Sequence, residues 1–389
     1  MKHIILEAKE IDGLVFDLAD LEVRLNTLKD PRDKRGRVYT LGSLLSMIVL
    51  AKLSGQDKPK AIFEWIRLRK QEFVTIFKLK RDQTPCLNTI RTVLGSQIVL
   101  SELEQTLQRY LYEQYGGQNS VLIGIDGKTM RGTIPKGYTQ GLHLLSAYLV
   151  EEGIVLKQIE VASKQNEISA APQLLAGLDL KGKIVCADAM QTQRTFCVDV
   201  LARGGNYVLW VKQNQQTLLA DIEQFFNPPR RAAGWHIPAL PQTEATIPSK
   251  GHGRIERRTL TLMQDEQQFI DWPGIQQVFR LTRYTKEVRT GVETTTVVYG
   301  LTSCNFDTAN AATLLDWTQK YWGIENGLHY RRDVSLYEDA TRIKDNRPLA
   351  QAIAIINNFI VGLIRKLGFV NLPSARRRFD VQIARQLVF

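Results

Sequence analysis

Three acidic residues occupy positions from which their carboxylates could serve one reaction. Asp126 follows the apolar run Val121–Ile125, and Asp188 follows a second such run, Lys183–Ala187. Short runs rich in Val and Ile predict buried strands, each ending here at a carboxylate. If the two strands are neighbours, both aspartates project from the same edge of the sheet. Glu325 lies in a predicted helix that could return to face them.

The three carboxylates predict a metal-dependent reaction on phosphodiesters. Carboxylates that converge repel one another unless cations lie between them. Oxygen ligands suit Mg²⁺ or Mn²⁺ and argue against zinc, and two ions roughly 3.5–4 Å apart support in-line attack on a phosphodiester. We therefore expect Asp126, Asp188 and Glu325 to be catalytic residues and ligands of two metal ions. Taken alone, Asp126 before Gly127 is better explained as the start of a turn.

The composition favours a soluble protein with a polyanionic partner. The chain has 389 residues, 44% of them hydrophobic, and a formal net charge of +11. This length predicts two or three domains, and the basic balance indicates nucleic acid. Four cysteines without a C-x-x-C pair argue against a thiolate zinc site or a disulfide framework. Without a secretion signal or a membrane-length apolar run, we expect a cytoplasmic, nucleoid-associated protein and no membrane partner.

Residues 1–118 are predicted to form a helical domain that binds DNA or assists its binding. Leu41–Ala51 has the composition of a helix core, and Ala61–Phe77 places apolar and basic residues at helical spacing. The segment Pro85–Leu94, with Asn88 as its cap, could be the recognition helix of a helix-turn-helix unit. A plain helical bundle with a solvated basic face explains each single residue somewhat better, though not the region as a whole.

Residues 119–226 are predicted to form the first part of an α/β core. After the strand before Asp126, a hairpin is followed by helix, strand, helix and strand, which is the order of a ribonuclease-H-like core. These elements are predicted at Leu144–Val150, Ile154–Val161, Ala170–Leu178, Lys183–Ala187, Gln193–Ala202 and Asn206–Lys212.

Residues 227–303 are predicted to be a β-rich insertion in that core, and residues 304–389 to complete the core and add C-terminal helices. The charged segment Gly251–Arg258 suits a phosphate-facing loop, or equally an edge strand with solvated charges. The short β-like runs of the insertion are Arg258–Leu262, Val278–Thr282 and Thr294–Leu301, and the helices that follow are Ala309–Trp322 and Ala350–Leu367, before a basic tail.

Several separate motifs occur along the chain. They are Ile125–Gly132, His143–Ala147, Lys164–Ile168, Ala187–Gln193, Tyr207–Gln215, His252–Arg257, Trp322–Tyr330, and Asp333 with Glu338–Ala340. Together they resemble the bacterial insertion-sequence transposases of the DDE class, in the branch that includes the H-repeat-associated proteins. The resemblance extends from about Asp30 to the C-terminus.

The resemblance implies a ribonuclease-H-like catalytic domain interrupted by a β insertion, with Asp126, Asp188 and Glu325 as its triad. It further implies a protein that binds the ends of its own element, cuts them and joins them to target double-stranded DNA, as a homodimer on DNA. Two alternatives remain. One is a DNA-binding descendant that has lost catalysis, and the other is a metal-dependent nuclease that cuts DNA without joining it.

The resemblance also suggests DNA contacts. Lys212, Asn214 and Gln215 fall where the family has a Lys-x-Asn-Gln element beside the active site, and we expect Lys212 to hold a phosphate. The two amides could equally cap the next helix.

On the glutamate helix the wider superfamily carries Tyr, Arg and Lys, whereas this chain has Thr318, Tyr321 and Arg332, of which only Arg332 keeps the charge. His329 and Asp333 are expected to share a helix face with Glu325. His329 could orient a phosphate or Glu325, or be a packed, hydrogen-bonded histidine. The remaining candidates for DNA contact are Lys128, Arg131, Arg254 and Arg332.

Overall fold

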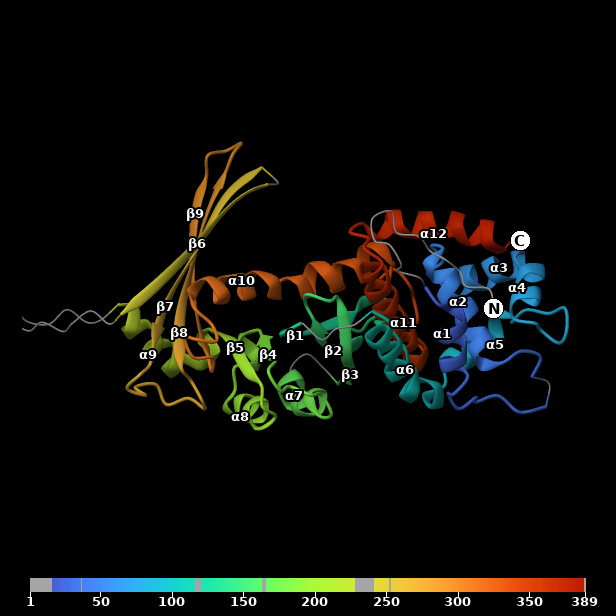
Figure 1. The fold of residues 1–389 in the computed structure, drawn as a ribbon, viewed down its shortest axis with the longest axis horizontal. Coiled ribbons are helices and arrows are strands. Elements are labelled where there is room, and N and C mark those ends of the chain that lie inside the picture. The colour runs from blue at the N-terminus through green and yellow to red at the C-terminus, as the bar shows by residue number, and fades with distance from the viewer. Residues whose placement is uncertain are drawn as a thin grey trace, which may run out of the picture. The chain divides into compact units, whose positions relative to one another are not determined.

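The fold is taken from a computed structural model, which describes residues 16–35, 37–115, 120–162, 166–227, 241–251 and 253–387. The motifs beginning at Lys164 and at His252 therefore lie partly outside the described residues. The chain divides into two compact units (Figure 1). The first unit comprises residues 1–119, 127–164 and 325–389, and the second comprises residues 120–126 and 165–324. Strand β1 (Leu122–Met130) belongs to both, with its first half in the second unit.

The N-terminal part of the first unit is helical. Every residue of α2 is buried, as expected of a helix that is apolar all round. The predicted helix Ala61–Phe77 is two helices that meet at Arg69. Asn88 does not cap α5, because that helix begins one residue earlier, at Leu87. The helices among its described residues are α1 (Leu18–Leu25), α2 (Leu41–Leu53), α3 (Pro59–Leu68), α4 (Lys70–Ile76), α5 (Leu87–Leu94) and α6 (Gln97–Tyr115).

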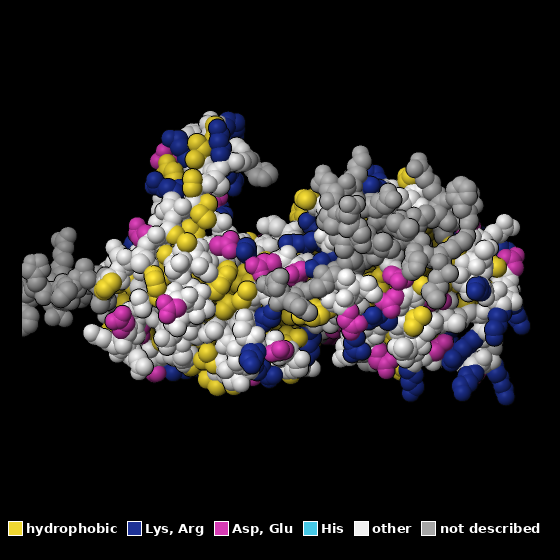
Figure 2. All heavy atoms as spheres, viewed as in Figure 1, with side chains coloured by type: hydrophobic (Ala, Val, Ile, Leu, Met, Phe, Trp, Pro, Cys, Tyr) yellow, Lys and Arg dark blue, Asp and Glu magenta, His cyan; other side chains and the backbone are white. Residues whose placement is uncertain are grey.

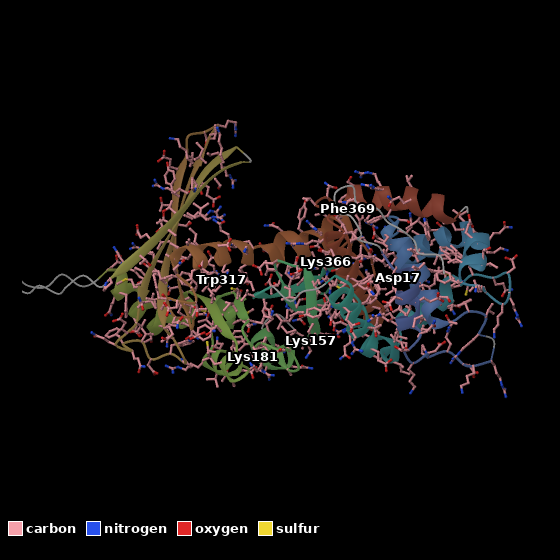
Figure 3. The ribbon with its side chains drawn as sticks, viewed as in Figure 1. Asp17, Lys157, Lys181, Trp317, Lys366 and Phe369 are labelled. Carbon is pink, nitrogen blue, oxygen red and sulfur yellow. The ribbon has the colours of Figure 1, made fainter. Side chains whose placement is uncertain are left out.

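Helix α11 (Arg347–Lys366) lies in the core of the first unit, where it packs against α6 and β3 (Ile154–Val161). Among the described residues it is the one helix long and apolar enough to span a membrane, but 89% of its apolar window is buried inside the fold. Its hydropathy is therefore that of a core helix. Lys366, labelled in Figure 3, ends the helix and forms an ion pair with Glu152. The basic tail is a further helix, α12 (Leu372–Leu387).

The strands follow the predicted α/β pattern. In the first unit the order is β3-β2-β1, in which β2 (Leu142–Leu149) pairs with β3 as an antiparallel hairpin. In the second unit β1 continues the order as β1-β4-β5, with β4 (Ile184–Ala187) parallel to β1 and β5 (Asn206–Val211) parallel to β4. Three strands in succession followed by two parallel strands confirm the ribonuclease-H-like class. The core helices are α7 (Glu167–Leu175), α8 (Arg194–Ala202) and α9 (Gln216–Phe226).

The insertion forms four antiparallel strands that extend the sheet of the second unit in the order β5-β9-β8-β7-β6. Its strands are longer than the predicted runs: β6 (Gln242–Gly251), β7 (Arg254–Gln264), β8 (Gln277–Glu287) and β9 (Glu293–Thr302). Strand β6 was not predicted, because it is exposed along almost its whole length and contains Pro248. Proline is tolerated there because β6 is an edge strand. Helix α10 (Ala311–Tyr321), which carries Trp317 (Figure 3), packs against β6 and β7.

Candidate active site

Asp126 and Asp188 lie at matching positions on two neighbouring parallel strands of the second unit. The register of β1 and β4 pairs Gly124 with Cys186 and Ile125 with Ala187, so each aspartate directly follows one member of the last pair. Neighbouring strands are about 4.8 Å apart. Both aspartates are half-buried, whereas the residues that precede them are buried. The structure thus brings together two of the three predicted carboxylates at one edge.

Strand β1 does not end at Asp126, contrary to the prediction, but continues to Met130. What ends beside Asp126 is the parallel pairing with β4, because the chain turns away from the strand after Ala187. Tyr321 on α10 donates a hydrogen bond from its hydroxyl to the carbonyl oxygen of Ile125, at 3.2 Å. This buried side chain therefore fixes the backbone immediately before Asp126. This role of Tyr321 was not predicted from the sequence.

The backbone after Asp188 forms a short 3-10 helix, η3 (Ala189–Gln191), for which Asp188 is the cap. One carboxylate oxygen, Oδ1, accepts a hydrogen bond from the amide of Met190 at 3.0 Å. This bond restricts the rotation of the Asp188 side chain, as expected of an N-cap residue. The carboxylate is held by its own loop before any ligand binds.

Asn214 and Gln215 donate hydrogen bonds to the same loop after Asp188. The Asn214 amide donates to the carbonyl oxygen of Ala189 at 2.6 Å, and the Gln215 amide donates to that of Thr192 at 2.9 Å. Gln215 precedes α9 but makes no side-chain cap bond to it. These amides therefore position the Asp188 loop. The structure favours this role over capping, and it engages the donors that a DNA contact would use.

Glu325 is exposed and begins a π-helical segment, Glu325–His329, in the first unit. A second π-helical segment, Arg331–Ser335, follows it. A π-helix has a wider turn than an α-helix and occurs often at functional sites. Its wider turn means that residues four apart do not align, and His329 is accordingly buried while Glu325 faces solvent. The predicted shared face of Glu325, His329 and Asp333 is not observed.

Lys128 lies two residues after Asp126 and is 7% exposed. Its ammonium nitrogen is 2.6 Å from Asp333 Oδ1, 3.2 Å from Asp339 Oδ1 and 3.8 Å from Glu338 Oε1. Burial raises the pKa of Asp333, and Lys128 only partly offsets that rise. The structure therefore places Lys128 in an internal ion cluster instead of at a surface that DNA could reach.

Arg332 is fully buried, so it cannot contact DNA in this structure and the prediction for it is corrected. Its guanidinium forms hydrogen bonds of 2.8–3.1 Å with both carboxylate oxygens of Glu338 and one of 3.1 Å with Gln158. Asn357 on α11 donates to the same carboxylate at 2.8 Å. Burial alone would raise the pKa of Glu338, but the charges and hydrogen bonds of its partners outweigh burial and the pKa is lowered.

The remaining candidates for DNA contact are exposed. Arg131 has 81% of its side chain exposed, and its backbone amide donates to Asp339 at 2.9 Å. Lys212 is exposed at the end of β5, and Arg254 is exposed at the first residue of β7. Figure 2 shows Lys and Arg side chains gathered at the free end of the insertion sheet, where Arg254 and Lys286 occupy paired strands.

The aspartate pair suits a hard divalent cation. Mg²⁺ is commonly bound by one or two carboxylates together with phosphate oxygens of the substrate. Asp126 and Asp188 supply such oxygens from paired strands, and the loop bonds described above restrict the Asp188 side chain. Among the described residues, no group of three or more His, Cys, Asp or Glu side chains is arranged to hold a metal ion. The pair therefore fits part of the predicted ligand set.

Comparison with known families decides the classification. Residues 118–361 match the family described as transposase DDE domain, and residues 23–111 match the one described as DDE_Tnp_1-associated. The chain belongs to the DDE transposase family. The predicted resemblance is thereby confirmed, and the matched region contains Asp126, Asp188 and Glu325.

Curated relatives of this DDE transposase family member cover most of the chain. YncI of Escherichia coli O157:H7, provisionally named a transposase, is 28% identical over 92% of this chain and 90% of its own length. The H repeat-associated protein YhhI of E. coli K12 is 27% identical over 90% of this chain and 95% of its own. A solved structure of the piggyBac transposase synaptic complex with hairpin DNA is 10% identical at a TM-score of 0.46, covering 95% of this chain and 78% of that one.

Proposed function

We propose that this protein is a DNA transposase that cuts the ends of its own element and joins them to target DNA by metal-dependent phosphoryl transfer. The observation that carries the proposal is the pair of half-buried carboxylates, Asp126 and Asp188, at matched positions on parallel strands. Membership of the DDE transposase family supports the same chemistry.

In this proposal, carboxylates of the chain are the ligands of the metal ions. Asp126 and Asp188 would hold two Mg²⁺ or Mn²⁺ ions, and Glu325 would complete the ligand set. Such ions, when bound, supply activation of the attacking oxygen and stabilisation of the leaving oxygen. The bond from Met190 to Asp188, and the fastening of the loop by Asn214 and Gln215, keep the Asp188 carboxylate in one orientation. Orientation fixed in advance is what a metal-dependent site requires.

A concave surface in the first unit offers a place for DNA. A cavity of about 460 Å³ lies between the loop before α2 and the segment after α4, with Phe77 and Leu79 among its apolar lining residues. Arg37, Lys78 and Lys80 are exposed lining residues of the same cavity. Exposed cations in a concave surface suit the sugar-phosphate backbone of DNA. We infer that this cavity, which α5 does not line, is the DNA contact of the N-terminal region.

The double substitution Lys78→Ala with Lys80→Ala is expected to weaken DNA binding and to lower the slope of log affinity against log salt by about 2, because each lysine neutralises about one phosphate. Fluorescence anisotropy across a salt series measures this slope. Lys60→Ala is the matched control, since Lys60 is exposed on α3 and pairs with Glu64. An unchanged slope in the double variant would contradict DNA binding at this cavity.

Strand transfer separates transposition from plain cutting. Duplexes carrying the inverted repeats of the element, with free 3′ hydroxyls, are incubated with the protein, Mg²⁺ and supercoiled plasmid. We expect joined products, formed by two copies of the protein on paired ends, and light scattering of the complex should give a dimer. Cut ends without joined products would support a nuclease instead.

A further inference from the structure

The segment that follows Glu325 is tied to the second half of strand β1, inside the first unit. Lys128 on β1 meets Asp333, Asp339 and Glu338, which lie 8 to 14 positions after Glu325 in the chain. The backbone amide of Arg131 adds a bond of 2.9 Å to Asp339. The end of β1 and the segment Asp333–Asp339 are therefore joined by the ion pairs of Lys128 and by one backbone hydrogen bond.

The loop also approaches the strand end through its backbone. Gly132 lies so close to the loop that a β-carbon there would be 2.3 Å from the carbonyl oxygen of Thr341. The amide of Ile343 donates to the carbonyl oxygen of Gly132 at 3.1 Å. Tyr337 adopts a left-handed backbone conformation with φ of 50°, which is unfavourable for a residue other than glycine. Such a conformation persists only where the surrounding contacts determine it.

We propose that Lys128 is a positioning residue, whose ammonium holds the segment beginning at Glu325 against the second half of β1, inside the first unit. This inference rests on the proposed function, because it assigns Lys128 a part in placing Glu325, one member of the triad. Lys128 touches neither DNA nor metal in this role. It acts through Asp333 and Asp339, and Arg332 and Asn357 hold Glu338 in place beside them.

Removal of the ammonium should loosen the segment after Glu325. The side chains of Lys128 and Asp339 are 7% and 24% exposed, so solvent screens the remaining carboxylates only in part. Without Lys128, Asp333 and Asp339 repel each other and the loop leaves Gly132. Partners that orient metal ligands typically contribute about 10–100-fold to metal affinity or activity when they are removed.

Hydrogen exchange tests the positioning independently of catalysis. In Lys128→Met, amides of residues 325–335 are expected to exchange about tenfold faster, since loss of a local anchor lowers the free energy of local opening. Lys128→Arg, which keeps the charge, should retain most of the protection. Asp339→Asn can still accept from Arg131 but loses the ion pair, so it should show an intermediate increase even if Lys128→Met does not fold. Lys366→Met, which breaks the ion pair with Glu152 in the same unit, is the matched control.

The second measurement is DNA-end cleavage and DNA affinity for the same variants. Lys128→Met should cut about 10–100-fold more slowly while its affinity for end DNA stays within twofold of wild type. The double variant Lys128→Met with Asp339→Asn should be no slower than Lys128→Met alone, since both substitutions break one cluster.

Two results would overturn the positioning role. One is unchanged exchange of residues 325–335 in both Lys128→Met and Asp339→Asn. The other is a weaker DNA affinity of Lys128→Met with a salt slope lowered by about 1, which would make Lys128 a phosphate contact. If the wild-type protein does not cut DNA, the proposed function fails, and the exchange data still decide whether Lys128 anchors the segment.

Discussion

Asp188→Asn is expected to lower the rate of DNA-end cleavage by about 10²–10³-fold, the usual loss when one preorganised charge-stabilising group is removed from a reaction centre. Asparagine keeps the shape of the side chain and can still accept the hydrogen bond from Met190. The loop should therefore stay folded while the negative charge that attracts a cation is lost. Cleavage of end-labelled duplexes under single-turnover conditions measures the effect.

Asp179→Asn is the matched control for this substitution. Asp179 also precedes a short turn, accepts a hydrogen bond from a backbone amide two residues later at 3.0 Å, and is exposed. It lies before β4, whereas Asp188 follows β4. The control should cut DNA at the wild-type rate. Equal rates for the Asp188→Asn variant and the wild type would remove Asp188 from the catalytic residues.

Arg332→Met is expected to lower the free energy of unfolding by about 3–5 kcal/mol, because it leaves a buried carboxylate without its ion-pair partner. Arg332 and Glu338 are both completely buried, with 2.8 Å between Nη2 of the guanidinium and Oε1 of the carboxylate. Lys128 lies farther from the same oxygen, at 3.8 Å, and cannot replace a bidentate guanidinium. Urea denaturation of the full chain measures the loss.

Arg347→Met supplies the comparison, since Arg347 forms an ion pair with Glu160 at the same 2.8 Å but with 68% of its side chain exposed. Exposed pairs typically contribute about 0–1 kcal/mol. The double variant Arg332→Met with Glu338→Leu should recover part of the stability, because it removes both charges. A loss in Arg332→Met no larger than that in Arg347→Met would contradict the structural role of the buried pair.

Elements with a local signal were predictable from the sequence. The run Ile154–Val161 coincides with β3, and Gln193–Ala202 differs from α8 by one residue. Both combine a hydrophobic pattern with a clear glycine or turn boundary. Strand β6 and helix α12 carried no comparable pattern. Strand β6 is exposed on both faces, and the arginines of α12 made its sequence resemble a basic tail.

The pairing of Asp126 with Asp188 was predictable from the sequence, but the surroundings of the candidate site were not. Asp126 and Asp188 could be paired because each directly follows a short apolar run, although β1 itself continues past Asp126 to Met130. The roles of Lys128 and Arg332 could not be predicted, because Lys128 meets Asp339 across 211 positions of sequence. A buried cation and a solvated one look the same in a sequence. The acids Glu338 and Asp339 stood in a recognised motif, which was the available signal.

The division into two units also could not be predicted from the sequence. The predicted boundaries at residues 118, 226 and 303 follow changes in sequence pattern, whereas the first unit combines three separate stretches of chain. They are joined by packing of α11 against α6 and β3 and by the buried pair between Asp57 and Arg376. Contacts of this kind depend on the tertiary fold and have no local signature.

The most direct test of the account is cleavage of labelled DNA carrying the flanking inverted repeats, with Mg²⁺ and with EDTA. Cuts at the repeat ends are expected with Mg²⁺ and none with EDTA, because the carboxylates of Asp126 and Asp188 act by holding the cation. Cuts that persist in EDTA would contradict metal-dependent catalysis. Binding of the repeats without cleavage in every lane would instead identify a DNA-binding descendant that has lost the reaction.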